Sequence, residues 1–369
     1  MGKKQWKTVA VSVATLTLLS LLVFWVFRDH YQEILQNIRD VSVGPLLFLL
    51  GMGILYQLLE AAICMILVRR RLPVFSFSQA VEVVFLGVFG NVSTLSVGSV
   101  PMQSYYLHRC GLMAGRGIGT MTLEYVFHKS SVLLYTTAML LLQGCWLSES
   151  GGRFTGYLWL GYGICAVIIV VLLLLCSWEK VQWLAAWLID RLPHTEKWEG
   201  RKQLWKANLA ALYIESRQLL CDRPCILKVL GLNGLKLCCL YCIPFLAMRI
   251  LGLSGLSFWQ VQMLAALMHL ISNALPNVAG VGPVEFAFVL IFSHYMEYAQ
   301  ASSALILYRI ATFFFPFILS VIVFLRVQKR VLSQTARSVV KQTGCFVGVS
   351  RTAVSGGRCV LSPPDCFVA

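Results

Sequence analysis

Long uncharged apolar runs are the feature that most constrains how this chain can fold. Residues 8–27 carry no charged side chain, and neither do residues 83–107. A helix of about 20 apolar residues spans the hydrocarbon core of a bilayer. Only 13% of the residues are charged, about half the usual share of a soluble domain. The sequence therefore predicts an all-α, polytopic integral membrane helix bundle.

The distribution of basic residues predicts how the bundle is oriented. Basic clusters lie at 3–7, 69–71 and 326–330, next to apolar runs. Such clusters mark the cytoplasmic side of a membrane protein, so we expect a multi-pass cell-membrane protein with both termini in the cytoplasm. The predicted spans are residues 8–27, 41–68, 130–148, 157–178, 226–251 and 303–325.

The sequence divides into a membrane domain and a tail. Residues 1–330 hold all the apolar runs, and within them the Trp-rich, charged stretch 179–223 is predicted to be an amphipathic cytoplasmic connector. Residues 331–369 are rich in Ser, Gly and Cys and lack periodicity. We expect this last segment to be a disordered cytoplasmic tail.

Two apolar segments, 83–107 and 250–284, do not fit as simple crossings. The first has basic residues on both sides, at 69–71 and 108–116. A single crossing would place one basic set outside, whereas a re-entrant hairpin from the cytoplasm avoids this conflict. The second must cross an even number of times, which either a hairpin from the outside or two full spans would satisfy.

The centres of the two segments share a pattern of helix-breaking and polar residues. The spacings of seven, three and two residues coincide, although a chance match is an alternative. The first set is Asn91, Gly98, Pro101 and Gln103, and the second is Asn273, Gly280, Pro283 and Glu285. Broken helices that enter from opposite faces are typical of inverted-repeat transporters, whose site lies between the repeats.

These motifs resemble the transmembrane, flippase-like domain of the lysylphosphatidylglycerol synthase family, over about residues 8–330. One family pattern is echoed by Thr94, Gly98, Pro101 and Gln103, and another by Pro276, Gly282 and Glu285, followed by Arg309 in the last span. The chain departs from these patterns at Leu95, Ser99 and Val278, which bears on the loop geometry.

The resemblance implies a bacterial lipid-metabolism protein that binds or translocates phospholipid between leaflets and contributes to resistance to cationic antimicrobial peptides, a form of antibiotic resistance. The expected ligand is anionic or aminoacylated phosphatidylglycerol. The alternative is phosphatidylglycerol lysyltransferase activity, which in full-length members belongs to a cytosolic domain that uses lysyl-tRNA. We expect no such domain in the residues after Arg330. A third hypothesis is recruitment of a separate synthase subunit through residues 179–223.

Charged and polar residues within apolar runs are the candidate site, because burying them in a membrane is costly. Glu285 could meet a lipid ammonium group, pair with Arg309 or cap its helix, and Arg309 could clamp a phosphate or pair with Glu285. The other candidate binding residues are Asn91, Gln103, Asn273 and Glu124. Glu124 lies with His128 and Lys129 at a predicted span start. The predicted loop-forming residues are Gly98, Pro101, Pro276, Gly280, Gly282 and Pro283.

The remaining features favour structural interpretations. Lys228 and Lys236 could extend to the interface, Glu60 could serve a cavity or a helix contact, and His269 is expected to be a hydrogen-bonded interior group. Glycines 111, 115 and 119 would allow close helix packing. Cys238 and its neighbours lack the ligand set of a metal site. With no nucleotide or catalytic motif in the sequence, we expect no cofactor, no metal and no direct nucleic-acid binding.

Overall fold

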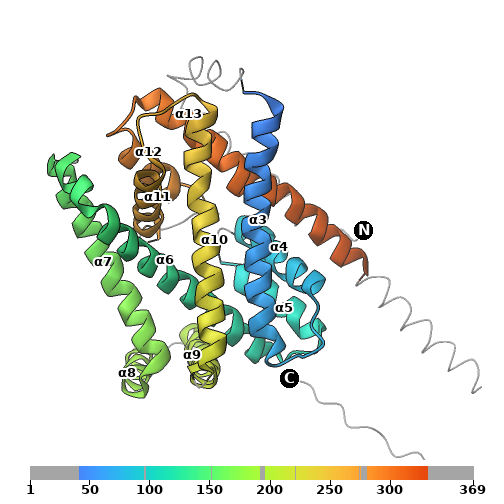
Figure 1. Ribbon diagram of the computed structural model, residues 1–369. Coiled ribbons are helices and arrows are strands. Elements are labelled where there is room, and N and C mark those ends of the chain that lie inside the picture. Colours follow the sequence, from blue (N-terminus) through green and yellow to red (C-terminus); the bar gives the residue numbers. More distant parts are fainter. Residues whose placement is uncertain are drawn as a thin grey trace, which may run out of the picture. The chain divides into compact units, whose positions relative to one another are not determined.

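The computed structural model describes residues 41–94, 97–150, 152–191, 196–220, 222–273, 275 and 281–330. Helices form nearly all of this part of the chain (Figure 1). They are α3 (Val43–Arg69), α4 (Phe77–Ser93), α5 (Ser99–Arg109), α6 (Ala114–Ser150), α7 (Gly152–Ser177), α8 (Glu179–Asp190), α9 (Glu196–Leu220), α10 (Arg223–Ile250), α11 (Phe258–Ser272), α12 (Pro283–Phe292), α13 (Tyr298–Arg309) and the π-helix η2 (Ile310–Phe314).

Five described helices are long and apolar enough to cross a bilayer, which confirms the predicted class. They are α3, α6, residues Thr155–Leu174 of α7, α10 and the run Tyr298–Arg330. The predicted first span and the predicted tail lie outside the described residues, as do Pro276 and Gly280. The chain divides into two compact units after Phe324; the described part of the second, residues 325–330, is helical.

The same order of elements occurs twice along the chain. A long helix is followed by two short helices with a break between them and then by another long helix, first as α3–α6 and again from α10 through α13. In both halves the first short helix begins with a Ser-Phe-x-Gln capping box, at Ser76 and at Ser257. The serine oxygen accepts the Gln79 or Gln260 backbone N–H, and the glutamine oxygen accepts the serine N–H. This shared start extends the internal similarity beyond the central motifs.

The two halves run in opposite directions. Arg70, at the end of α3, lies 3.5 Å from Asp222, which caps the start of α10. The two long helices pack against each other and are therefore antiparallel, as Figure 1 shows. It follows that the pair α4–α5 begins at one end of the bundle and the pair α11–α12 at the other. This geometry supports an inverted repeat, while entry of the two pairs from opposite membrane faces stays a prediction.

Each helix break is built from the residue types that the sequence placed there. Thr94 Oγ1 donates to the Gly90 carbonyl over 2.7 Å, and a Cβ at Gly98 would lie only 2.3 Å from that hydroxyl oxygen. In the second half Gly282 has φ +106°, a conformation that residues with a Cβ rarely adopt. Pro283 then opens α12, since its missing N–H costs nothing in a first turn.

The connector is part of the bundle. It forms α8 and α9, and α9 packs against α6, α7 and α10. Arg71, just beyond α3, holds the carboxylate of Glu215 on α9 through both Nε and Nη2, at 3.2 and 3.1 Å. A Cβ at Gly119 would lie 2.9 Å from the Ala211 carbonyl oxygen. Residues 196–220 therefore contribute to the packing of the helices on either side.

Three expectations about individual residues are wrong. Helix α6 begins at Ala114, so Glu124, His128 and Lys129 lie inside a 37-residue helix and not at a span start. Of the three predicted packing glycines only Gly119 makes a close contact; Gly111 forms a turn at φ +103°. Lys236 does not extend to the interface, because its side chain is fully buried.

Candidate functional site

Helix α6 carries several of the polar groups in the interior of the bundle. It packs against α5 of the first half and against α10 and α11 of the second. Glu124, His128 and Lys129 lie along its middle part. The sequence predicted a site where the two broken hairpins meet. In the structure α5 of the first pair and α11 of the second pair both pack on α6.

A buried ionic cluster joins α3, α6 and α10; its members are Glu60, Glu124, His128 and Lys236. Lys236 Nζ forms an ion pair with Glu60 and lies 3.1 Å from His128 Nδ1. The Lys236 side chain is fully buried, whereas the Glu60 side chain is 24% exposed. The ring of Tyr56 lies 5.6 Å from the same ammonium group. Sequence reasoning noted these side chains singly and missed their association.

Glu124 is the second carboxylate of this cluster. Glu124 is only 6% exposed, and its Oε1 atom has no hydrogen-bond partner among the described residues. Glu60 and Lys236 are both within electrostatic range of it. The predicted candidate Glu124 therefore lies in the interior and not at a solvated interface, and it retains an acceptor atom that another group could use.

A second ion pair lies at the start of α12, directly after the break at Gly282. Arg309 Nη2 of α13 lies 2.6 Å from Glu285 Oε1 of α12, and their side chains are only 10% and 15% exposed. Glu285 Oε2 also accepts the Gly282 backbone N–H over 2.7 Å. The pairing and the capping interaction suggested by the sequence thus occur together. The Arg309 guanidinium also lies 5.4 Å from the Phe313 ring centre.

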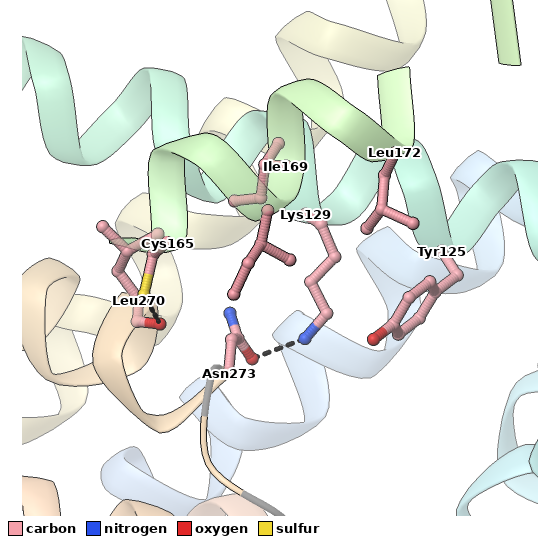
Figure 2. Close-up of a pocket in the computed structure, with 8 residues that line it drawn as sticks. Tyr125, Lys129, Cys165, Ile169, Leu172, Leu270 and Asn273 are labelled. Atoms are coloured by element: carbon pink, nitrogen blue, oxygen red, sulfur yellow. Dashed lines mark hydrogen bonds between the residues drawn. The ribbon is translucent and has the colours of Figure 1, made fainter. Parts of the chain in front are cut away.

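A crevice between α6, α7 and α11 holds the third polar group. Lys129 Nζ donates to Asn273 Oδ1 over 2.5 Å at its floor, as Figure 2 shows. Tyr125, Cys165, Ile169 and Leu172 contribute to its walls. The predicted candidate Asn273 therefore has a partner on α6. Lys129 and Arg309 are both within electrostatic range of the buried His269.

The two remaining candidates belong to the first half and lie apart from these groups. The Gln103 side chain packs over Gly87, where a Cβ would be 2.5 Å from Gln103 Nε2. Asn91 is half-buried and makes no hydrogen bond with the described part of the chain. Gln103 thus fills the space between α4 and α5, a contact that sequence spacing did not predict.

His269, expected to be a hydrogen-bonded interior group, faces the aromatic ring of a neighbouring helix. Its Nδ1 atom has no hydrogen-bond partner among the described residues, and its ring packs edge-on against Tyr241 at 5.9 Å. Within the described part of the chain, no three His, Cys, Asp or Glu side chains are grouped so as to hold a metal ion. The polar interior consists of ion pairs and amides, which are suited to binding a charged headgroup.

Comparison with known proteins gives one finding. No curated protein matches the chain, but residues 9–320 match the family described as the lysylphosphatidylglycerol synthase TM region. This match covers the helices that carry every polar group described above. The chain therefore belongs to the lysylphosphatidylglycerol synthase transmembrane family.

Proposed function

We propose that this protein binds the headgroup of an anionic or aminoacylated phospholipid inside its helix bundle and carries it between leaflets. The observation that supports this most directly is the largely buried Glu285–Arg309 ion pair at the break between α11 and α12. Both side chains come from the second half, next to backbone that leaves the helical path at Gly282. Non-helical backbone at membrane depth occurs where it is buried in protein or lines a wet cavity.

The chemistry of the pair matches the chemistry of such a headgroup. A guanidinium group can bind a phosphate through two parallel hydrogen bonds, and a carboxylate can bind an ammonium group. An aminoacylated phosphatidylglycerol carries both a phosphate and an ammonium group. It could therefore replace the counter-charge of Arg309 and of Glu285 at once, so neither side chain would be left unpaired when the lipid binds.

Two nearby features favour an ion pair that exchanges its partners for a lipid headgroup over an ion pair that only stabilises the fold. Arg309 immediately precedes η2, and π-helical turns occur often at functional sites. Gly282 forms the joint at the other partner's helix start, in a backbone conformation that residues with a Cβ rarely adopt. The proposed contribution to peptide resistance would follow from moving a cationic lipid to the outer leaflet, where it reduces the negative surface charge that attracts cationic peptides.

A lipid-scrambling assay in proteoliposomes tests the proposal. In vesicles that contain fluorescent phosphatidylglycerol and wild-type protein, an external quencher should remove nearly all of the fluorescence. In empty vesicles it should remove about half, because the lipid of the inner leaflet is protected. Glu285→Gln and Arg309→Gln should slow this exchange, and Glu297→Gln, which changes an exposed glutamate in the same region, should not. Equal rates for wild type, both site variants and empty vesicles would refute the proposal.

A charge swap separates a lipid-binding role from a structural one. The double variant Glu285→Arg/Arg309→Glu retains an ion pair between α12 and α13 but loses the acceptor for the Gly282 N–H, an acceptor that Glu285→Gln keeps. If the pair only holds these helices together, the swapped protein should move lipid like wild type. If the pair binds the headgroup, the swapped protein should fold, as judged by its unfolding temperature in detergent, and yet move lipid slowly because each charge now faces the wrong part of the ligand.

A further inference from the structure

The crevice between α6, α7 and α11 combines a polar floor with apolar walls. Lys129 and Asn273 form the floor, and the walls include Ile168, Ile169, Leu172 and Leu270. The crevice is open on one side, and its empty space of about 330 Å³ includes that open part. Figure 2 shows the Lys129 ammonium and the Asn273 amide facing each other beneath the side chains of α7.

Lys129 has donor capacity left over. An ammonium group has three N–H donors, and the hydrogen bond to Asn273 uses one of them. No carboxylate in the described part of the chain forms an ion pair with Lys129. Among the described residues, the Lys129 ammonium also contacts the Tyr125 ring, whose centre is 4.9 Å away. A cation held in place without an anion is suited to an anionic ligand.

Asn273 adds a second unsatisfied donor at the same place. Its Oδ1 accepts from Lys129, while its Nδ2 is buried and has no hydrogen-bond partner among the described residues. A buried donor that lacks an acceptor costs about 1–3 kcal/mol. An oxygen atom that entered between the two side chains could accept from both and remove this cost.

The walls indicate that the ligand comes from the bilayer. Helix α7 has a mean hydropathy of 2.5 over its membrane-length window, of which only 17% is buried. Ile168, which lines the crevice, is 46% exposed, and its neighbours Val167 and Val171 are 65% and 47% exposed. In a membrane this face contacts lipid chains, so the crevice opens sideways to the bilayer and not to bulk water.

We propose that this crevice holds one anionic membrane phospholipid, with a phosphate oxygen at Lys129 and Asn273 and an acyl chain along α7. The inference rests on the proposed function and adds to it a lateral site through which lipid reaches the interior. His269 lies within electrostatic range of both Lys129 in the crevice and Arg309 in the ion pair.

Native mass spectrometry of the purified full chain tests this site. The protein would be titrated in detergent with phosphatidylglycerol, with diacylglycerol of the same acyl chains and with inorganic phosphate. Phosphatidylglycerol should be retained by the wild type and by Lys129→Arg, and Lys129→Met should weaken its retention by about tenfold or more. Diacylglycerol should bind equally weakly to all three proteins.

Asn273→Asp provides an independent variant of the same size. The new carboxylate would form an ion pair with the Lys129 ammonium group in place of the lipid phosphate. Phosphatidylglycerol retention should therefore fall although the lysine is unchanged. Lys228→Met is the matched control, since it removes an exposed lysine from α10 and should leave retention as in wild type. An unchanged unfolding temperature for each variant shows that the fold survives.

The outcomes separate this inference from the proposed function. Equal phosphatidylglycerol retention by wild type and Lys129→Met would overturn the crevice site, as would tight binding of inorganic phosphate with no preference for the lipid. Scrambling by wild-type protein would still support the proposed function in that case. Lysine-dependent retention without any scrambling would refute the proposed function and leave the lipid site in place.

Discussion

At the residue scale, the interior depends on partners that are far apart in the chain. Lys236 and Glu60 are 176 positions apart, and no local pattern connects them. The sequence could show that Glu285 and Arg309 were costly in an apolar run, and it named their pairing as one alternative. It could not show which way Lys236 faces, because an apolar helix can rotate about its axis without changing its hydropathy.

Removing either partner of the Lys236–Glu60 pair should have unequal effects. Glu60→Gln leaves a fully buried ammonium group without its carboxylate and should lower stability by about 3–5 kcal/mol. Lys236→Met leaves a carboxylate that is 24% exposed and can still meet water, so the loss should be smaller. Thermal unfolding in detergent measures both.

The double variant Glu60→Gln/Lys236→Met provides the control for this pair. It buries no full charge at either position and should recover most of the stability that Glu60→Gln loses. A double variant as unstable as the sum of the single variants would show that the two side chains act independently.

At the scale of elements, sequence reasoning located the breaks better than the helix starts. Gly98 and Pro283 lie at the two predicted breaks, because glycine and proline act through local backbone geometry. The start of α6 was missed because Arg116, Glu124 and Lys129 made residues 114–129 look too polar to cross a membrane. Tertiary packing decides that case, since Glu124 is only 6% exposed within the bundle.

The contact between α3 and η2 should tolerate no side chain at Gly53. A Cβ there would lie 2.1 Å from the Ala311 carbonyl oxygen, so Gly53→Ala must push the two helices apart. We expect a loss of about 1–3 kcal/mol, seen as a lower unfolding temperature. Gly51→Ala, two residues earlier in the same helix with nothing within 4 Å of its Cβ, should behave like wild type.

The joint at Gly282 should be sensitive to backbone strain alone. Nothing lies within 4 Å of a Cβ at this position, but φ is +106°, which costs an L-residue about 1–3 kcal/mol. Gly282→Ala should therefore lower both stability and lipid exchange. Gly231→Ala, at an open position inside α10, should leave both unchanged or raise stability. Equal behaviour of the two variants would show that the joint is unstrained.

At the scale of the whole molecule, the contacts of α9 gather the predicted cytoplasmic parts at one end of the bundle. Arg70 donates to the Gln218 carbonyl over 2.8 Å, and Arg71 pairs with Glu215. The basic cluster at 69–71 and the connector were predicted to share a side from charge alone. The sequence could not predict their docking, because amphipathic helices can rest on a membrane as well as on protein.

Thiol labelling tests the predicted re-entry of the first hairpin. In a variant without native cysteines, Arg69→Cys and Arg116→Cys should both react with a membrane-impermeant maleimide from the same side of sealed vesicles. Ser254→Cys, which lies between α10 and α11 at the other end of α10, should react from the opposite side. Labelling of positions 69 and 116 from different sides would mean that residues 77–109 cross the membrane.

The π-helical turn Ile310–Phe314 has a consequence for how the last helix can vary. A π turn holds one residue more than the α-helical turn it replaces, and each residue advances an α-helix by about 100°. Rewinding this turn into a regular α-helix without removing a residue would therefore rotate the residues that follow by about 100° relative to Arg309. Deleting one residue from the turn at the same time would cancel that rotation. The π turn thus determines which of the following residues lie on the same face of the helix as Arg309.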